Sequence, residues 1–117
     1  MACRLYRQGD ILLEPIPAPP AGCAEAQAKE RKGALVHVLA EGETSGHAHC
    51  IAAGPGTRFL LPQSSGDPLA LGYLALQALA RLVHDEHGAI ELPPGNYRVI
   101  QQRRYDPGTG LWRRAQD

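Results

Sequence analysis

The sequence predicts one mainly β domain, a small barrel or sandwich with at most one short helix. Glycine and proline contribute 13 and 10 of the 117 residues and divide the chain into short pieces. Hydrophobic residues make up 44% of the chain, which is typical of a globular protein. Short apolar pieces separated by turn residues favour strands over helices, and 117 residues suit a single domain spanning 1–117.

The first strand is expected from Asp10 to Ile16, after a short lead-in at Leu5–Tyr6. Residues 17–33 then begin with prolines, which cannot donate a backbone hydrogen bond to a sheet, so we expect a surface loop there. Within this loop, Ala24 to Lys32 are rich in good helix formers, which predicts at most one helical turn.

Three further strands are expected in the middle of the chain, each bounded by glycine or other turn residues. They run from Ala34 to Ala40, from Ala48 to Ala52 and from Thr57 to Leu61. The last strand is expected from Tyr97 to Tyr105, and residues 106–117 are expected to form a C-terminal tail.

The segment from Leu69 to Val83 fits two structures. Apolar residues at positions 71, 74, 75, 78, 79 and 82 match a helical stripe. Leu74 and Leu76 on either side of Ala75 also fit the alternation of a strand. We predict a strand because the surrounding turn residues favour strands, and the helix stays open as the alternative.

The overall charge gives no indication of a strongly electrostatic partner. Twelve basic side chains balance twelve acidic ones, so neither nucleic acid nor a membrane surface is expected as a partner. Arginines do gather near the C-terminus, but strand alternation places Arg98 and Arg104 on one face and Arg103 on the other. We therefore expect solvated strand residues and a basic tail there, including Arg113 and Arg114.

The cysteines and the N-terminus indicate a cytoplasmic protein. Cys3, Cys23 and Cys50 are odd in number and lack CxxC spacing, which excludes a disulfide framework and a cysteine-type zinc finger. The first residues contain no apolar run like that of a signal peptide, and no segment approaches the roughly 20 apolar residues of a membrane span. No GxGxxG, P-loop, GxSxG or HExxH motif is present.

Four of the five histidines fall into two short motifs, His47-Ala48-His49 and His84-Asp85-Glu86-His87. Histidine is the side chain best suited to bind a metal such as zinc through a neutral ring nitrogen. Alternate side chains of a strand project to one face, so the rings of His47 and His49 should lie together, with Cys50 pointing away. A polar loop whose histidines face water is the plain alternative.

His84 and His87 are three residues apart, and the sequence leaves their arrangement open. In a helix or a tight turn the two rings converge, and the following Gly88 favours a turn. In an extended strand His84 shares a face with Glu86 instead. Either arrangement predicts a metal site, with Glu86 as a further ligand or as general base. In the turn its histidine ligands are His47, His49, His84 and His87. In the extended strand the ligands are His47, His49 and His84 together with Glu86.

The fifth histidine and the second motif have plain explanations too. His37 stands alone in an apolar strand, where a histidine is typically a packed residue, so we do not count it as a ligand. An exposed charged turn is the alternative for residues 84–87.

Residues 42–49, Gly-Glu-Thr-Ser-Gly-His-Ala-His, resemble the first motif of the cupins, a glycine followed by HxH. Residues 88–95, which end in Leu-Pro-Pro-Gly, resemble the Pro-x-Gly hairpin of the second cupin motif. The chain departs from the pattern, because no glutamate follows His49 at the usual short interval and residues 96–98, Asn-Tyr-Arg, stand where a histidine is expected. The resemblance implies a double-stranded β-helix and a divalent ion of Zn, Fe, Mn or Ni.

Residues 84–105 also resemble a family of small bacterial proteins with an HxH motif, an HxxH motif and a final strand rich in Gln and Arg. No activity attaches to that family, so this resemblance adds no function to the metal site.

Two functions are consistent with such a site, and a third, weaker alternative needs no metal: an interaction or nucleic-acid adaptor that uses the Arg-rich last strand. In a metal-dependent enzyme, zinc would favour hydrolysis by lowering the pKa of its bound water toward ~7, and iron would favour oxygen chemistry. Glu86 would then act as general base on a small-molecule ligand. In a non-catalytic binding or accessory module, all four histidines would close the coordination sphere and stabilise the fold. A homodimer that covers an edge strand is also expected.

Overall fold

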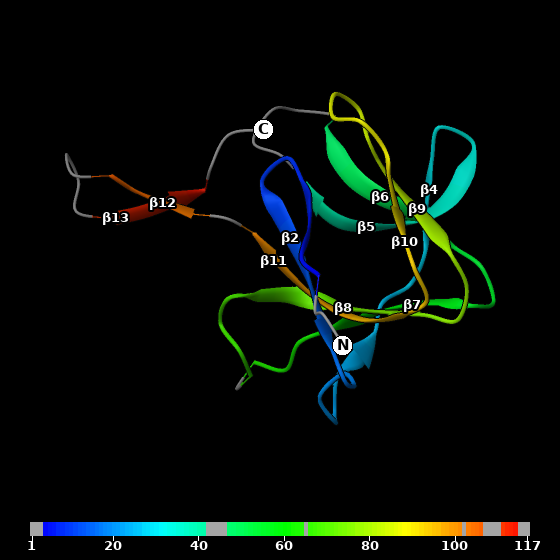
Figure 1. Ribbon diagram of the computed structural model, residues 1–117, viewed down its shortest axis with the longest axis horizontal. Coiled ribbons are helices and arrows are strands. Elements are labelled where there is room, and N and C mark those ends of the chain that lie inside the picture. The colour runs from blue at the N-terminus through cyan, green and yellow to red at the C-terminus, as the bar shows by residue number, and fades with distance from the viewer. Residues whose placement is uncertain (1–3, 42–46, 65, 102, 107–110, 115–117) are drawn as a thin grey trace.

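The computed structural model describes residues 4–41, 47–64 and 66–101, together with the backbone of 103–106 and 111–114. Within these residues the chain forms β-strands and no helix (Figure 1). The prediction of a mainly β chain is therefore confirmed.

Strands β1 to β11 form two antiparallel sheets, and six of them belong to the first. They are β1 (Tyr6–Gln8), β2 (Ile11–Ile16), β3 (Ala24–Glu25), β7 (Thr57–Leu61), β8 (Ala70–Leu76) and β11 (Gly95–Gln101). Their order across the sheet is β1-β2-β11-β8-β7-β3. The N-terminal strand β2 thus lies between β1 and β11, the last strand of this sheet in chain order.

The second sheet contains five strands. They are β4 (Lys29–Arg31), β5 (Ala34–Glu41), β6 (Ala48–Ala52), β9 (Ala80–His84) and β10 (Ile90–Leu92). Their order is β10-β9-β6-β5-β4, so the strands that carry the two histidine motifs, β6 and β9, are neighbours. His49 lies directly opposite His84 in their register.

Both sheets contribute to one hydrophobic core. Leu13, Leu74 and Val99 come from the first sheet, and Ile51 and Leu82 from the second; all five are fully buried in the same cluster. Burying a side chain of this size contributes roughly 1.5–3 kcal/mol. Each sheet therefore depends on the other for its stability, and together they fix the relative positions of β2, β6, β9 and β11.

No helical turn forms within residues 24–32, where the sequence predicts a surface loop with at most one such turn. Two short strands form there instead, with β3 pairing with β7 and β4 pairing with β5. A two-residue turn joins β4 to β5, and its residues Lys32 and Gly33 have φ angles of 53° and 82°. Hairpin turns of this kind require positive φ at both positions. Pairing with two sheet edges outweighs the helix propensity of this short segment.

The strand prediction for residues 69–83 is confirmed, and the helical alternative is wrong. The segment forms β8 and β9, which belong to different sheets. Strand β8 pairs with a neighbour on each side and is buried along most of its length. Its apolar residues therefore face both sides of the sheet, which is why they also matched a helical stripe.

The strand expected over Tyr97–Tyr105 is divided in two. Strand β11 ends at Gln101, and β12 (Arg103–Asp106) pairs with β13 (Leu111–Arg114) in a separate two-stranded sheet. The side chains of the arginines at 103, 104, 113 and 114 lie outside the described residues. Arg98 forms ion pairs with Glu14 and Asp67, which gives it a structural role.

The cysteines of the described residues, Cys23 and Cys50, are free thiols, and burial raises the pKa of Cys50. Cys3 lies outside the described residues. No helix in the described part of the chain is long and apolar enough to cross a membrane.

A glycine in β8 is required by close packing, and this leads to a prediction. A Cβ atom at Gly72 would lie 2.5 Å from Cζ of Phe59 and 2.7 Å from the carbonyl oxygen of Leu60. Gly72→Ala should lower the free energy of unfolding by about 1–3 kcal/mol, the usual cost of overpacking. Urea denaturation measures this, with Gly54→Ala as the control, because nothing lies within 4 Å of that Cβ position. Equal stability of the two variants would contradict the described packing.

Candidate functional site

The two histidine motifs meet at one end of the second sheet. The ring centroids of His49 and His84 are 4.3 Å apart, and those of His84 and His87 are 4.5 Å apart. His47 lies 5.9 Å from His84, and His49 lies 6.3 Å from His87. We call these four residues the histidine cluster. Segments 35 or more positions apart are thus brought together by the pairing of β6 with β9.

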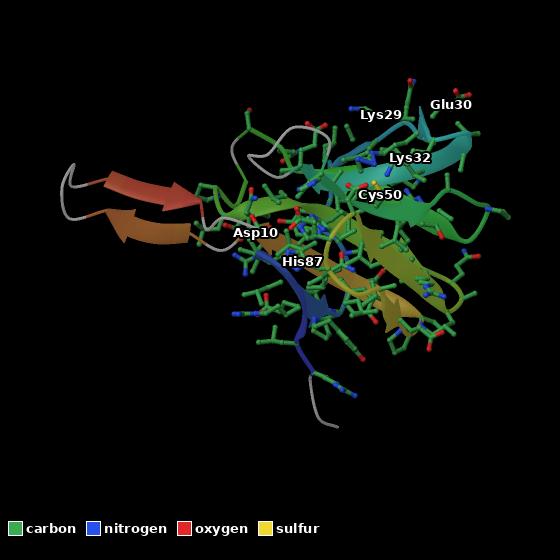
Figure 2. All side chains as sticks on the ribbon, turned by 90° about the horizontal axis from the view of Figure 1, so that it is seen from above. Asp10, Lys29, Glu30, Lys32, Cys50 and His87 are labelled. Atoms are coloured by element: carbon green, nitrogen blue, oxygen red, sulfur yellow. The ribbon has the colours of Figure 1, made fainter. Side chains whose placement is uncertain are left out.

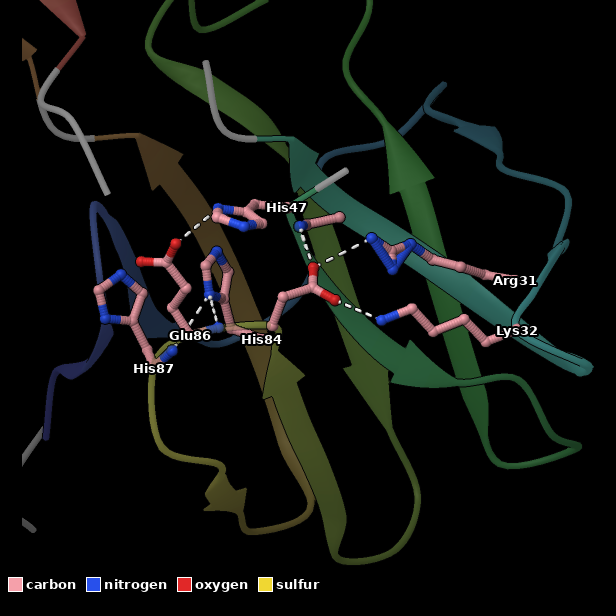
Figure 3. A network of polar contacts seen from close by, with 8 residues as sticks. Arg31, Lys32, His47, His84, Glu86 and His87 are labelled. Atoms are coloured by element: carbon pink, nitrogen blue, oxygen red, sulfur yellow. Dashed lines mark hydrogen bonds and ion pairs between the residues drawn. The ribbon is translucent and has the colours of Figure 1, made fainter. Parts of the chain in front are cut away.

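A tight turn after β9 brings His84 and His87 together. The Nδ1 atom of His84 accepts hydrogen bonds from the backbone N–H groups of Glu86, at 3.0 Å, and His87, at 3.2 Å (Figure 3). Of the two arrangements that the sequence left open, the structure has the turn. Because Nδ1 is an acceptor, the proton of the neutral ring is on Nε2.

Asp85 connects this turn to the end of β4 and to the segment that carries His47 and His49. Its carboxylate accepts hydrogen bonds from Arg31 at 3.0 Å, from Lys32 at 2.7 Å and from the backbone N–H of Ala48 at 2.9 Å (Figure 3). The hydrogen bond from Lys32, followed by that from Ala48, lowers the pKa of Asp85 from 3.8 to about 2. The two histidine motifs are therefore held together by charge as well as by strand pairing.

Glu86 points its carboxylate toward the cluster. Its Oε1 atom lies 3.1 Å from Nδ1 of His47, and 53% of its side chain is exposed. In Figure 3 the rings of His47 and His84 and the Glu86 carboxylate face one another. This side of the cluster is therefore open to a small molecule or ion from solvent.

His49 is fully buried and belongs to a polar network that the sequence did not reveal. Gln8 donates hydrogen bonds through Nε2 to the carbonyl oxygens of Leu82, at 2.9 Å, and Gly88, at 3.0 Å. Its Oε1 atom therefore faces His49, whose Nδ1–H donates to it at 2.9 Å. Both ring nitrogens of His49 are engaged, because Nε2 lies 3.1 Å from Oδ1 of Asp10.

The network continues from Asp10 to the last strand of the domain. Oδ2 of Asp10 accepts a hydrogen bond of 2.5 Å from Nε2 of Gln101. Because Oε1 of Gln8 accepts the Nδ1–H of His49, a hydrogen bond between Nε2 of His49 and Oδ1 of Asp10 requires a further proton on one of these two atoms. Gln8, Asp10, His49 and Gln101 are all at most 4% exposed, and we call them the buried polar network.

His87 packs its ring directly on the backbone of Gly9. A Cβ atom at Gly9 would lie 2.5 Å from Cδ2 and 2.6 Å from Nε2 of His87, and the φ angle of Gly9 is +56°. Figure 2 shows His87 beside the beginning of β2, where Asp10 lies. The Nε2 atom of His87 is buried and has no hydrogen-bond partner among the described residues. Leaving such a nitrogen unpaired costs about 1–3 kcal/mol, so its surroundings favour a partner from outside the chain.

The cluster is not arranged as a complete coordination sphere. Within residues 4–41, 47–64 and 66–101, no group of three or more His, Cys, Asp or Glu side chains is placed to hold a metal ion. The pairs His47–Glu86 and His49–Asp10 are each separated by 3.1 Å. Two ligands of one zinc ion, with bonds of about 2.1 Å, lie roughly 3.0–3.4 Å apart. Binding through such a pair would need little movement of that pair, although a third ligand would have to rotate into place.

Residues 7–102 match the family model described as a domain of unknown function, DUF8820. The chain belongs to this family. The matched range contains the histidine cluster, Glu86 and the whole buried polar network, which spans Gln8 to Gln101. No curated protein and no solved structure matches the chain.

The ion pairs of Asp85 lead to a prediction of pH dependence. Because its pKa is lowered in the folded state, Asp85 stabilises the protein fully above its ordinary pKa of 3.8, and this contribution is lost as the pH falls toward about 2. Asp85→Asn should therefore be less stable than the parent at pH 7, and the difference should shrink as the pH falls below 4. Urea denaturation at several pH values measures it, with the exposed Glu91→Gln as control. A difference that stays constant with pH would contradict the assigned ion pairs.

Asp10 should matter much more for stability than an exposed carboxylate. Asp10→Ala leaves His49 and Gln101 without their buried partner, and breaking a buried pair costs about 3–5 kcal/mol. The free energy of unfolding, measured with urea at pH 7, should fall by that amount, whereas Glu91→Ala should change it by less than about 0.5 kcal/mol. Similar values for both variants would show that the buried polar network is not formed.

Proposed function

We propose that this protein binds one divalent transition-metal ion at the histidine cluster. The observation that carries the proposal is the buried Nε2 atom of His87, which has no partner among the described residues although it lies within a group of imidazole rings. Neutral imidazole nitrogens and carboxylates together suit Zn, Fe, Mn or Ni. An ion would supply the partner that this nitrogen lacks.

The surroundings of each ring nitrogen suggest different roles for the four histidines. We assign His87 and His47 as the principal ligands, because His87 has a buried nitrogen with no partner among the described residues and Nδ1 of His47 faces the partly exposed carboxylate of Glu86. His84 would bind through Nε2 as a neutral ring, with its proton moved from Nε2 to Nδ1, and the hydrogen bonds that Nδ1 accepts from Glu86 and His87 would then be lost. Glu86 lies within reach of the same ion.

His49 is assigned as a positioning residue. Both of its ring nitrogens are engaged with Gln8 and Asp10, so it supports the neighbouring rings from inside the domain. Partners of this kind commonly change metal affinity by 10–100-fold when they are replaced. The ligand role that the HxH pattern predicts for His49 would require the ion to replace its contact with Asp10.

Between the two functions that the sequence left open, the exposure of the cluster favours an enzyme. Glu86 is half exposed at the open side of the cluster, where it could take a proton from a water molecule or a substrate as general base. A bound zinc ion would supply a water whose pKa is about 7. A structural ion would instead be enclosed by four protein ligands.

We also propose that the two sheets close into a cupin-like barrel around the core that they share. Two features support this proposal. The HxH motif enters β6 at the cluster, and Pro93 and Pro94 carry the chain from β10 in one sheet to β11 in the other, as the Pro-x-Gly resemblance implies.

The metal proposal is tested by metal content and affinity. Tag-free parent protein should contain close to one equivalent of metal by inductively coupled plasma mass spectrometry. Its titration with Zn²⁺ or Co²⁺ should saturate at one ion. The double variant His47→Ala/His87→Ala should lose this binding, and His37→Gln, which removes the histidine outside the cluster, should keep it. His49→Gln should lower affinity by about 10–100-fold.

The outcomes separate the roles. Absence of metal from the parent, with no change in melting temperature on adding Zn²⁺, Mn²⁺, Fe²⁺ or Ni²⁺, would overturn the proposal. A loss in His49→Gln as complete as that of the double variant would make His49 a ligand. A large fall in melting temperature on chelation would favour the non-catalytic, metal-stabilised module over the enzyme.

A further inference from the structure

A second candidate site lies away from the histidine cluster. A cavity of about 400 Å³ is bounded by residues 25–29, which run from β3 to β4, and by side chains of β5 and β7. Pockets that bind small molecules typically measure about 300–1,000 Å³. None of the cluster histidines lines this cavity, so it is independent of the proposed metal site.

The lining of the cavity is mainly apolar. Phe59 and Leu61 come from β7, Val38 comes from β5, and Ala26 follows β3. Phe59 belongs to the core and is only 3% exposed, whereas Leu61 is 44% exposed. The wall therefore runs from the core to the surface, as a small apolar ligand entering from solvent would require.

His37 is the polar group deepest in this lining. It is only 7% exposed, and its Nδ1 atom is buried without a hydrogen-bond partner among the described residues. Burial lowers the pKa of His37, and the charge of Glu25 opposes this only in part. The ring is therefore neutral at pH 7 and offers one donor and one acceptor nitrogen.

Two charged side chains flank the cavity, and only one of them is neutralised. Glu25 forms an ion pair of 2.8 Å with Arg58. Lys29 is exposed and forms no ion pair with any described residue. The unbalanced charge at the cavity is thus the Lys29 ammonium group, which favours an anionic ligand.

We propose that this cavity binds a small organic monocarboxylate with an apolar ring or short hydrocarbon chain. The carboxylate lies at Lys29, the apolar body packs against Phe59, Val38 and Leu61, and a polar atom of the ligand pairs with the His37 ring. Both the charge and the apolar body contribute, so neither is sufficient alone.

The test uses benzoate as the probe, with benzyl alcohol and acetate as matched ligands that lack the charge and the ring, respectively. NMR spectra of full-length protein are recorded with EDTA present, so that a metal ion cannot hold the carboxylate. Benzoate should give saturable shifts of the His37 ring signals and of the backbone amides of 25–29. Benzyl alcohol and acetate should each bind at least about tenfold more weakly, which corresponds to 1.4 kcal/mol.

Charge variants locate the carboxylate. Lys29→Gln should weaken benzoate binding by about tenfold. Arg7→Gln, which removes the same charge from an exposed position outside the cavity, should bind as the parent does. His37→Gln should also weaken binding, but the decisive comparison is between the two exposed positions, because neither substitution disturbs the core.

Three results would overturn the proposal. They are no saturable shift with benzoate, equal affinity of Lys29→Gln and the parent, and equal affinity for benzoate and benzyl alcohol. Because the cavity and the cluster share no residue, failure here leaves the metal proposal standing, and failure of the metal proposal leaves this one standing.

Discussion

The hydrogen-bonded contact between His49 and Asp10 is the interaction on which the candidate site depends. Both side chains are removed from water, so their polar atoms must be satisfied inside the protein. Gln8 and Gln101 do this from β1 and β11, at opposite ends of the described domain. The network therefore joins the first sheet to β6 of the second sheet. It also holds the buried ring of His49, beside which the rings of His84 and His87 lie.

The motif His-Asp-Glu-His assigns a different task to each of its four residues. His84 closes the turn through Nδ1, and Asp85 ties the turn to β6 and to the hairpin at Lys32. Glu86 reaches His47 at the open side, and His87 lies on the backbone of Gly9. Residues 84–87 thus include both residues that support the turn and a residue that faces solvent. From sequence alone, such a charged segment resembles an ordinary exposed turn.

Much of the fold and part of the site could be predicted from local sequence. Strands 48–52 and 57–61 have the expected bounds, because their apolar residues are enclosed by turn residues. The buried polar network could not be predicted, since Asp10 and Gln101 are 91 positions apart and neither has a local pattern that marks it as buried. The two short strands within 24–32 could not be predicted either, because strand pairing at a sheet edge depends on residues elsewhere in the chain.

The buried polar network is complete only when Gln101 has been synthesised, because Gln101 donates a hydrogen bond to Asp10. A ribosome makes the chain from its N-terminus, and Asp10 and His49 emerge long before Gln101. Until β11 has been made, Asp10 lacks the hydrogen bond from Gln101 and β2 lacks the neighbour with which it pairs on that side. The histidine cluster therefore gains its full support only when the domain is complete, so nascent and truncated chains would present the histidines without the architecture that orders them.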